Sequence, residues 1–194
     1  MTRNYKEILN RLPSGWDELS YGQYKEISLV TITEIDEVDE LFIGQENTLK
    51  TLSVLTGVPI EELRSASYDE VIPMANRIAF TTLLPEYNKN HSIKWKKMDK
   101  LPYDSYVNFL TLSKDPNKNM GAIVKDFSII ELSDEEVDQL SMLEVYSAFF
   151  TLRKYARRYF KNTINRSMAI LMKQLIKELL LIPLVQKFRN RRKN

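Results

Sequence analysis

Side chains that commonly carry catalysis are scarce in this chain. Its 194 residues include no cysteine and a single histidine, His91. A Cys/His zinc site, a two-histidine iron site or an HExxH site needs more of these side chains than the sequence holds, and a Ser-His-Asp triad would use the only imidazole. His91 lies among polar residues with no acidic neighbour in the sequence, which is typical of a connector. We expect no catalytic residue, no metal site and no cofactor.

Carboxylates are plentiful, but their spacing fits other roles. The acidic run at 34–40 does not match a calcium loop, which needs Gly at the sixth position and Glu at the twelfth. Counted from Asp36, these positions hold Leu41 and Asn47. The acids at 134–136 stand in the first turn of an expected helix, where they stabilise the helix dipole. No glycine-rich phosphate-binding motif occurs. We interpret the acidic run as a solvated loop or an electrostatic contact, and the protein as no enzyme.

Charge is divided unequally along the chain. The net charge is only +2, yet residues 1–149 hold 15 Lys and Arg against 25 Asp and Glu, a net charge of −10. Residues 150–194 hold 13 Lys and Arg against the single acid Glu178, a net charge of +12. Such a separation is typical of a chain whose one end meets a polyanion or an acidic protein surface. The candidate contact residues of this basic end are Arg153, Lys154, Arg157, Arg158, Lys161, Arg166, Arg189, Arg191, Arg192 and Lys193.

Three interpretations of the basic end stay open. Lys and Arg would bind nucleic-acid phosphates in a salt-sensitive way, would form a solvated face, or would dock on an acidic surface of a partner subunit. The acidic first 149 residues favour docking, because the basic end of one copy can then pair with the acidic part of the next. The apolar stretch at 164–185 is interrupted by charged residues, so we expect an amphipathic helix and no membrane contact.

Apolar residues recur at three- and four-residue spacing nearly throughout, which predicts an all-α protein. Ser133 before the acids at 134–136, and Ser67 with Glu70, predict capping boxes. Pro183 should stop or kink the last helix and leave 186–194 as a polybasic tail. The expected helices are 20–31, 46–55, 59–66, 68–83, 102–112, 120–129, 134–140, 142–161 and 163–182.

Two pairs of segments resemble each other in the same order. Residues 16–27 (WDELSYGQYKEI) match 100–109 (KLPYDSYVNF) at an offset of 82, and residues 62–71 match 136–145 at an offset of 74. Self-similarity of this kind indicates a duplicated unit. We therefore expect two similar small helical modules, at 1–90 with the acidic loop and at 91–150. Two long amphipathic basic helices and the polybasic tail follow as a C-terminal arm at 151–194.

The aromatic residues of the first pair have two interpretations. At helical spacing, such residues usually bury area in a core. The alternative is an exposed aromatic face that docks on a partner subunit. The candidate partner-binding residues are Trp16, Tyr21, Tyr24, Tyr103 and Tyr106.

Several of these residues carry a family resemblance. Trp16, Leu19-Ser20 and Gln23-Tyr24, followed by an L-x-G-[IV]-P-x-x-x-L segment at 55–63, resemble small helical proteins of the structural gene blocks of tailed bacteriophages, including crAss-like phages. The resemblance covers about residues 12–75, with the weaker second copy reaching about 150. That copy has Asp104-Ser105 where the first has Gly22-Gln23, so a ligand role common to both copies is not implied.

The resemblance implies a role in particle assembly. It points to a virion protein, a subunit of a homo-oligomeric neck or connector ring that joins portal and tail, assembled in the host bacterial cytoplasm. Its partners would be the portal, other neck or tail proteins and, without sequence specificity, packaged DNA. A tail assembly chaperone that leaves the virion is the alternative within the family. A DNA-binding protein acting through the basic C-terminus is the alternative outside it.

Overall fold

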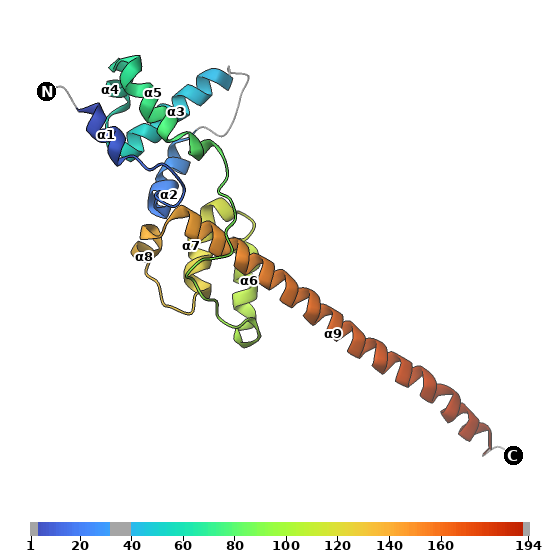
Figure 1. Ribbon diagram of the computed structural model, residues 1–194. Helices are drawn as coiled ribbons and strands as arrows, with labels where there is room; N and C mark the ends of the chain where they lie inside the picture. The colour runs from blue at the N-terminus through green and yellow to red at the C-terminus, as the bar shows by residue number, and fades with distance from the viewer. Residues whose placement is uncertain (1–3, 32–39, 192–194) are drawn as a thin grey trace. The chain divides into compact units, whose positions relative to one another are not determined.

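The computed structural model describes residues 4–31 and 40–191, and side chains for 4–31, 43–163 and 165–174. All regular elements in these ranges are helical, with isolated bridges in place of strands, so the all-α prediction is confirmed (Figure 1). The elements are α1 (Tyr5–Arg11), α2 (Tyr21–Val30), α3 (Glu40–Thr56), α4 (Ile60–Ser65), α5 (Tyr68–Arg77), the 3₁₀ turns η1 (Ala79–Thr82) and η2 (Met98–Lys100), α6 (Tyr103–Leu112), α7 (Pro116–Phe127), α8 (Asp134–Gln139) and α9 (Met142–Arg191).

The chain divides into two compact units, Met1–Thr151 and Leu152–Asn194. The first unit holds α1 to α8 and the first turns of α9. Within it α1 packs on α5, α3 packs on α4 and α5, and α7 packs on α6 and α8. Figure 1 shows α2 between α3 and α8, both of which it contacts. The second unit is the remainder of α9 with the chain end.

Local capping chemistry explains most helix starts. The Ser133 hydroxyl accepts a hydrogen bond from Glu136 N at 3.1 Å, and the Glu136 carboxylate accepts from Ser133 N, so the predicted capping box is confirmed. The box at Ser67 is confirmed as well. A third box at Ser20, closed by the Gln23 side chain, was not predicted. Helix α1 was also missed; Asn4 caps it by accepting from Glu7 N.

Several predicted helix boundaries were wrong, among them the start expected at residue 46, since α3 begins at Glu40. The helix expected to reach Leu83 ends at Arg77, and η1 follows. The hydroxyls of Thr81 and Thr82 each bond the carbonyl three residues back, at 2.8 Å, and such local bonds compete with helical ones. The start expected at residue 120 was late, because Asp115 caps α7 and Pro116 takes its first position, where proline is well tolerated.

The two long helices expected at 142–161 and 163–182 are one helix, α9, of 50 residues. The residue between the two expected helices is Asn162, not a glycine or a proline. An asparagine inside a helix costs less than about 1 kcal/mol relative to alanine. Pro183 was expected to stop or kink the last helix; it does not stop it, since α9 runs on to Arg191. One proline removes one backbone donor at a cost of about 3 kcal/mol, and the leucines around it are strong helix formers.

An apolar core joins α1, α3, α4 and α5. Its buried members are Leu12, Leu52, Val58, Leu63, Met74 and Ile78. Gly57 links α3 to α4 with a φ of 66°, a left-handed conformation that glycine adopts without strain at the end of a helix. The Ser53 hydroxyl then donates to the Val58 carbonyl at 2.7 Å, which closes the turn over the core.

A backbone bridge joins the starts of α2 and α9. Tyr21 N donates to Leu140 O at 2.8 Å, and Met142 N donates to Leu19 O at 2.7 Å. Ser20 and Ser141 face each other in this antiparallel bridge, and each hydroxyl accepts a bond from its own helix's first turn. The bridge satisfies backbone N–H groups that helix starts otherwise leave without a partner.

The side chain of Tyr21, the residue next to this bridge, packs against α7. Its side chain is 2% exposed, and its hydroxyl accepts a hydrogen bond from Gly121 N at 2.9 Å. A Cβ at Gly121 would lie 2.9 Å from the ring carbon Cζ and closer still to Cε1. Only a glycine therefore lets α7 approach the ring this closely.

Helix boundaries recur along the chain. Helices α2 and α6 both have ten residues and start 82 positions apart, at Tyr21 and Tyr103. Helices α4 and α8 both have six residues and start 74 positions apart. The helices that follow them, α5 and α9, begin at Tyr68 and Met142, again 74 positions apart.

The contact at Gly121 gives a matched pair of substitutions. Gly121→Ala should lower the free energy of unfolding by about 1 to 3 kcal/mol, because the added methyl group overlaps the Tyr21 ring. Gly44→Ala, at a helical position with nothing within 4 Å of the new Cβ, should raise it by up to about 1 kcal/mol. Urea unfolding followed by circular dichroism measures both, and equal effects of the two substitutions would refute the close approach.

Candidate functional site

Three of the five candidate aromatic residues meet beside α2. The Trp16 ring lies edge-on to Tyr24, with centroids 6.1 Å apart, and edge-on to Phe80 of η1 at 5.2 Å. Tyr21 and Tyr24 stack at 6.3 Å. Trp16 and Tyr24 are half-buried, and they line a hollow of about 150 Å³ that the exposed Leu83 and Leu84 also border.

Tyr21 belongs to the core rather than to a partner surface. Its ring is covered by α7, and its Gly121 bond uses its hydroxyl. Burial raises the pKa of the Tyr21 hydroxyl above its ordinary value, and the bond from Gly121 N opposes this in part. The core interpretation of the aromatic spacing therefore describes this residue.

Tyr103 and Tyr106 lie on a different element, α6. Tyr106 is half-buried, and its hydroxyl donates to the Met98 carbonyl. Tyr103 is 80% exposed. Although the repeat aligns Tyr21 with Tyr103, one ring is buried and the other lies in solvent.

The exposed side of α6 carries large apolar residues along its length, next to the charged Asp104. Val107 and Leu110 are 46% and 55% exposed and follow Tyr103 at four and seven residues. The opposite side packs on α7, where Phe109 meets Phe127 edge-on at 5.4 Å. We call Tyr103, Asp104, Val107 and Leu110 the α6 face. Sequence reasoning missed Val107 and Leu110, although their four- and seven-residue spacing from Tyr103 is the signal that would have found them.

The first turns of the corresponding side of α2 contact other elements, whereas Ser28, at the position that corresponds to Leu110, is exposed. Gly22 lies against α8, since a Cβ there would stand 3.2 Å from the Cβ of Asp138. Lys25 Nζ bonds the Asp138 carboxylate at 2.7 Å and lies 5.6 Å from the Tyr21 ring centroid. We call Tyr21, Gly22 and Lys25 the α2 face. Its partners are α7, α8 and the start of α9.

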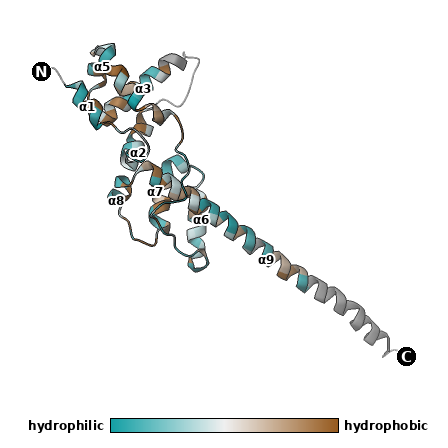
Figure 2. Ribbon diagram, in the orientation of Figure 1, coloured by the Kyte–Doolittle hydropathy of each residue, from teal (hydrophilic) through white to brown (hydrophobic). Residues whose placement is uncertain are grey.

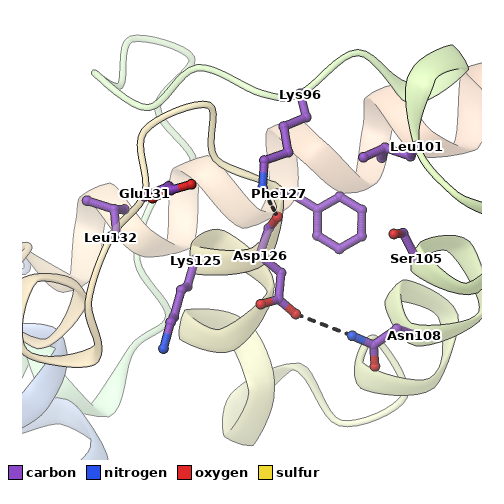
Figure 3. Close-up of a pocket in the computed structure, with 9 residues that line it drawn as sticks. All are labelled: Lys96, Leu101, Ser105, Asn108, Lys125, Asp126, Phe127, Glu131 and Leu132. Atoms are coloured by element: carbon purple, nitrogen blue, oxygen red, sulfur yellow. Dashed lines mark hydrogen bonds between the residues drawn. The ribbon is translucent and has the colours of Figure 1, made fainter.

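A polar cavity of about 360 Å³ opens between α6 and α7 (Figure 3). Lys96 Nζ donates to the Asp126 carbonyl at 2.8 Å, and Asn108 Nδ2 donates to the Asp126 carboxylate at 3.3 Å. In Figure 3 the Lys125 side chain points away from Asp126; it pairs with Asp134 at 2.9 Å, which raises the pKa of Lys125. These bonds brace α6, α7 and the connector against one another.

A larger hollow, of about 940 Å³, lies among α2, α3, α5 and the start of α7. Ile27, Leu29 and Ile78 contribute apolar surface to it, and its lining also includes small polar residues such as Thr48 and Thr81 and the charged Lys25, Asp115 and Lys118. It is wide enough to receive a side chain or a short segment of another chain.

The basic candidates on α9 face solvent as far as their side chains are described. Arg153, Lys154, Arg157, Arg158, Lys161 and Arg166 are exposed. Figure 2 shows hydrophilic turns in this part of α9, followed by more hydrophobic ones. In the latter, Met168, Ile170, Leu171 and Met172 are each more than half exposed. Arg189 and Arg191 have helical backbone but no described side chain, and Arg192 and Lys193 lie outside the described residues.

The remaining candidates are placed as follows. His91 is half-buried in the connector, and its ring centroid lies 6.0 Å from that of Trp95. Within the described residues, no group of three or more His, Asp or Glu side chains could hold a metal ion. No helix there is both long and apolar enough to cross a bilayer. The acidic run falls mostly at 32–39, outside the described residues.

Comparison of the chain with protein-family models, curated proteins and solved structures found no match.

Tyr21 gives a pH-dependent prediction. Because the folded state holds the Tyr21 proton more tightly than the unfolded state, its contribution to stability is complete below about pH 10 and is lost as the pH rises through the raised pKa. Tyr21→Phe should cost about 1 kcal/mol at pH 7 through the lost hydrogen bond, and should flatten the fall of stability above about pH 10.

Tyr155→Phe is the matched control, since this ring is exposed. It should leave both the stability at pH 7 and the alkaline slope unchanged. Urea unfolding at a series of pH values measures these quantities. Identical alkaline slopes for the two variants would contradict the buried placement of Tyr21.

Proposed function

We propose that this protein is a non-catalytic structural subunit of a tailed phage virion, in a neck or connector ring that joins portal and tail. The observation that carries the proposal is the character of α9. This single 50-residue helix presents exposed basic residues from Arg153 to Arg166 and then exposed apolar residues at 168–172. A long helix that exposes both kinds of surface is suited to contacts with other chains.

Charge supports association between copies. The net charge of −10 on residues 1–149 complements the net charge of +12 on residues 150–194. Opposite potentials steer molecules together and set the orientation in which they meet. When two different surfaces of the same chain meet, the assembly closes into a ring if the rotation allows it.

The repeated helix boundaries support a two-module organisation. The α2-to-α5 series at 1–90 would correspond to α6, α7, α8 and the start of α9 at 91–150, followed by the basic arm at 151–194. The shared starts of α2 and α6, of α4 and α8, and of α5 and α9 are the evidence for this duplication.

Partners and location follow from the same proposal. The ring would contact the portal and other neck or tail proteins, and the basic arm would meet either an acidic protein surface or packaged DNA. The protein would be made and assembled in the bacterial cytoplasm and would stay in the finished particle. The proposal includes no cofactor and no membrane contact.

A tail assembly chaperone is the second candidate. The hollow among α2, α3, α5 and α7 favours it, because a chaperone for a helical client needs an apolar groove. In that case the protein would act during assembly and leave the particle.

A DNA-binding protein is the third candidate. The exposed Arg and Lys side chains of α9 favour it, since phosphate binding requires accessible cations and no defined base contact.

The ring proposal predicts that the protein is part of the particle. Mass spectrometry of gradient-purified particles from the phage that encodes the chain should detect it in a fixed ratio to the portal protein. The same gradient fractions from a mutant phage that does not express the chain serve as the control. Absence from complete particles would refute the ring and leave the chaperone or the DNA-binding protein.

The DNA-binding candidate predicts a salt dependence. Truncation after Ile182 should abolish DNA retention at low salt. Arg157→Ala with Arg158→Ala should reduce the slope of log affinity against log salt concentration by about 2, one unit for each lost phosphate contact. Lys89→Ala with Lys94→Ala, in the exposed connector, is the matched control. A slope that does not change in the α9 variant would contradict phosphate binding by these arginines.

A further inference from the structure

The α6 face is exposed where its counterpart in the same chain is an internal contact. At the offset of 82 that aligns α2 with α6, Tyr103 corresponds to Tyr21 and Asp104 to Gly22. Tyr21 is 2% exposed, whereas Tyr103 is 80% exposed. The α2 face meets α7, α8 and the start of α9. The exposure of Tyr103 shows that no corresponding elements cover the α6 face within the described part of its own chain.

Part of the equivalent partner surface is exposed as well. At the offset of 74, α8 corresponds to α4, and Met142 at the start of α9 corresponds to Tyr68 at the start of α5. Met142, whose backbone N donates to Leu19 O in the bridge, is 1% exposed, whereas Tyr68 is 75% exposed. Inside the chain, the α2 face is joined to the surface formed by α8 and Met142. The counterparts of these two surfaces, the α6 face and the surface formed by α4 and Tyr68, each expose a tyrosine.

Charge is complementary between the two exposed surfaces. Inside the chain, position 22 faces position 138, with Cβ atoms that would lie 3.2 Å apart. The counterparts of these positions are Asp104 on α6 and Arg64 on α4, which carry opposite charges. Arg64 pairs with Glu46 at 2.7 Å but is half-exposed, and a guanidinium has enough donors to bind a second carboxylate.

We propose that α6 of one copy docks on α4 and the start of α5 of a second copy, in the way that α2 docks on α8 and the start of α9 within one chain. Tyr103 and Tyr68 are then covered by the facing copy, and Asp104 meets Arg64. This inference rests on the two-module organisation given under the proposed function and deepens it by naming the surfaces through which copies associate.

The proposed contact joins two different surfaces of one chain. We call Arg64 and Tyr68 the α4–α5 surface. Each copy then offers one α6 face and one α4–α5 surface, so association continues from copy to copy until a ring closes. Apolar contact at Tyr103, Val107 and Leu110 supplies the burial, and the Asp104–Arg64 pair sets the register.

Charge reversal tests the contact on the full-length protein. Asp104→Arg and Arg64→Asp should each weaken self-association about tenfold or more, because like charges then face each other. An equimolar mixture of the two variants should associate as the wild type does, since opposite charges face each other at every contact when the two variants alternate. Sedimentation velocity over a range of concentrations measures all three samples.

Two controls keep the test specific. Glu131→Arg and Lys89→Asp make the same changes of net charge at exposed positions on other segments, and each should leave self-association unchanged. Circular dichroism establishes that every variant is folded. Tyr103→Ser, at an exposed position, should weaken association with no change of charge.

A wild-type protein that stays monomeric at all concentrations would overturn the proposal. So would single variants that associate like the wild type, or a mixture that fails to recover. The outcome is separable from the proposed function. Self-association by this contact without the protein in particles would refute the virion role alone, and presence in particles without recovery in the mixture would refute this contact alone.

Discussion

The antiparallel bridge between residues 19–21 and 140–142 is the constraint on which the rest of the first unit depends. It joins two helix starts that lie more than a hundred residues apart and whose dipoles both place positive charge at the junction. Glu144, in the first turn of α9, supplies negative charge close to the junction. Two short backbone bonds at 2.7 and 2.8 Å thus set the position of α2 against the second half of the unit.

Several other contacts follow from this bridge. Because Tyr21 begins α2, the bridge directs its ring beneath α7, where only Gly121 leaves room for it. One turn later Lys25 reaches Asp138, and Gly22 lets α2 and α8 approach closely. Ile27, on another side of α2, is buried, and α2 contacts α3. One short helix is therefore covered on several sides, whereas α6 keeps one apolar side in solvent.

Helices and caps could largely be predicted from the sequence, because their causes are local. Ser133 with Glu136 and Ser67 with Glu70 close boxes within four residues, and proline and glycine mark the turns around 57–59. The length of α9 could not be predicted from the sequence around Pro183, because a proline inside a helix favours a stop or a kink there, yet α9 runs on to Arg191.

The candidate site was harder to predict, since burial depends on partners far away in sequence. Tyr21 and Tyr103 share the same local pattern, yet only Tyr21 has a bridge beside it and a glycine on the facing helix. Nothing in the spacing around Gly121 marks it as the residue that admits a ring. The exposure of the basic residues from Arg153 to Arg166 could be predicted from their spacing alone, because an exposed helical face needs no distant partner.

Engineered cysteines test the central claim, contact between the α6 face and the α4–α5 surface of a second copy, most directly, because the natural chain has no cysteine. Ser20 and Ser141 oppose each other in the bridge, and their counterparts are Pro102 and Ser67. Opposed residues of an antiparallel bridge are close enough for a disulfide. Mixing a Pro102→Cys chain with a Ser67→Cys chain under mild oxidation should give a mixed dimer that neither variant forms alone. Cross-linking no greater than that with a Glu131→Cys chain in place of Ser67→Cys would contradict the account.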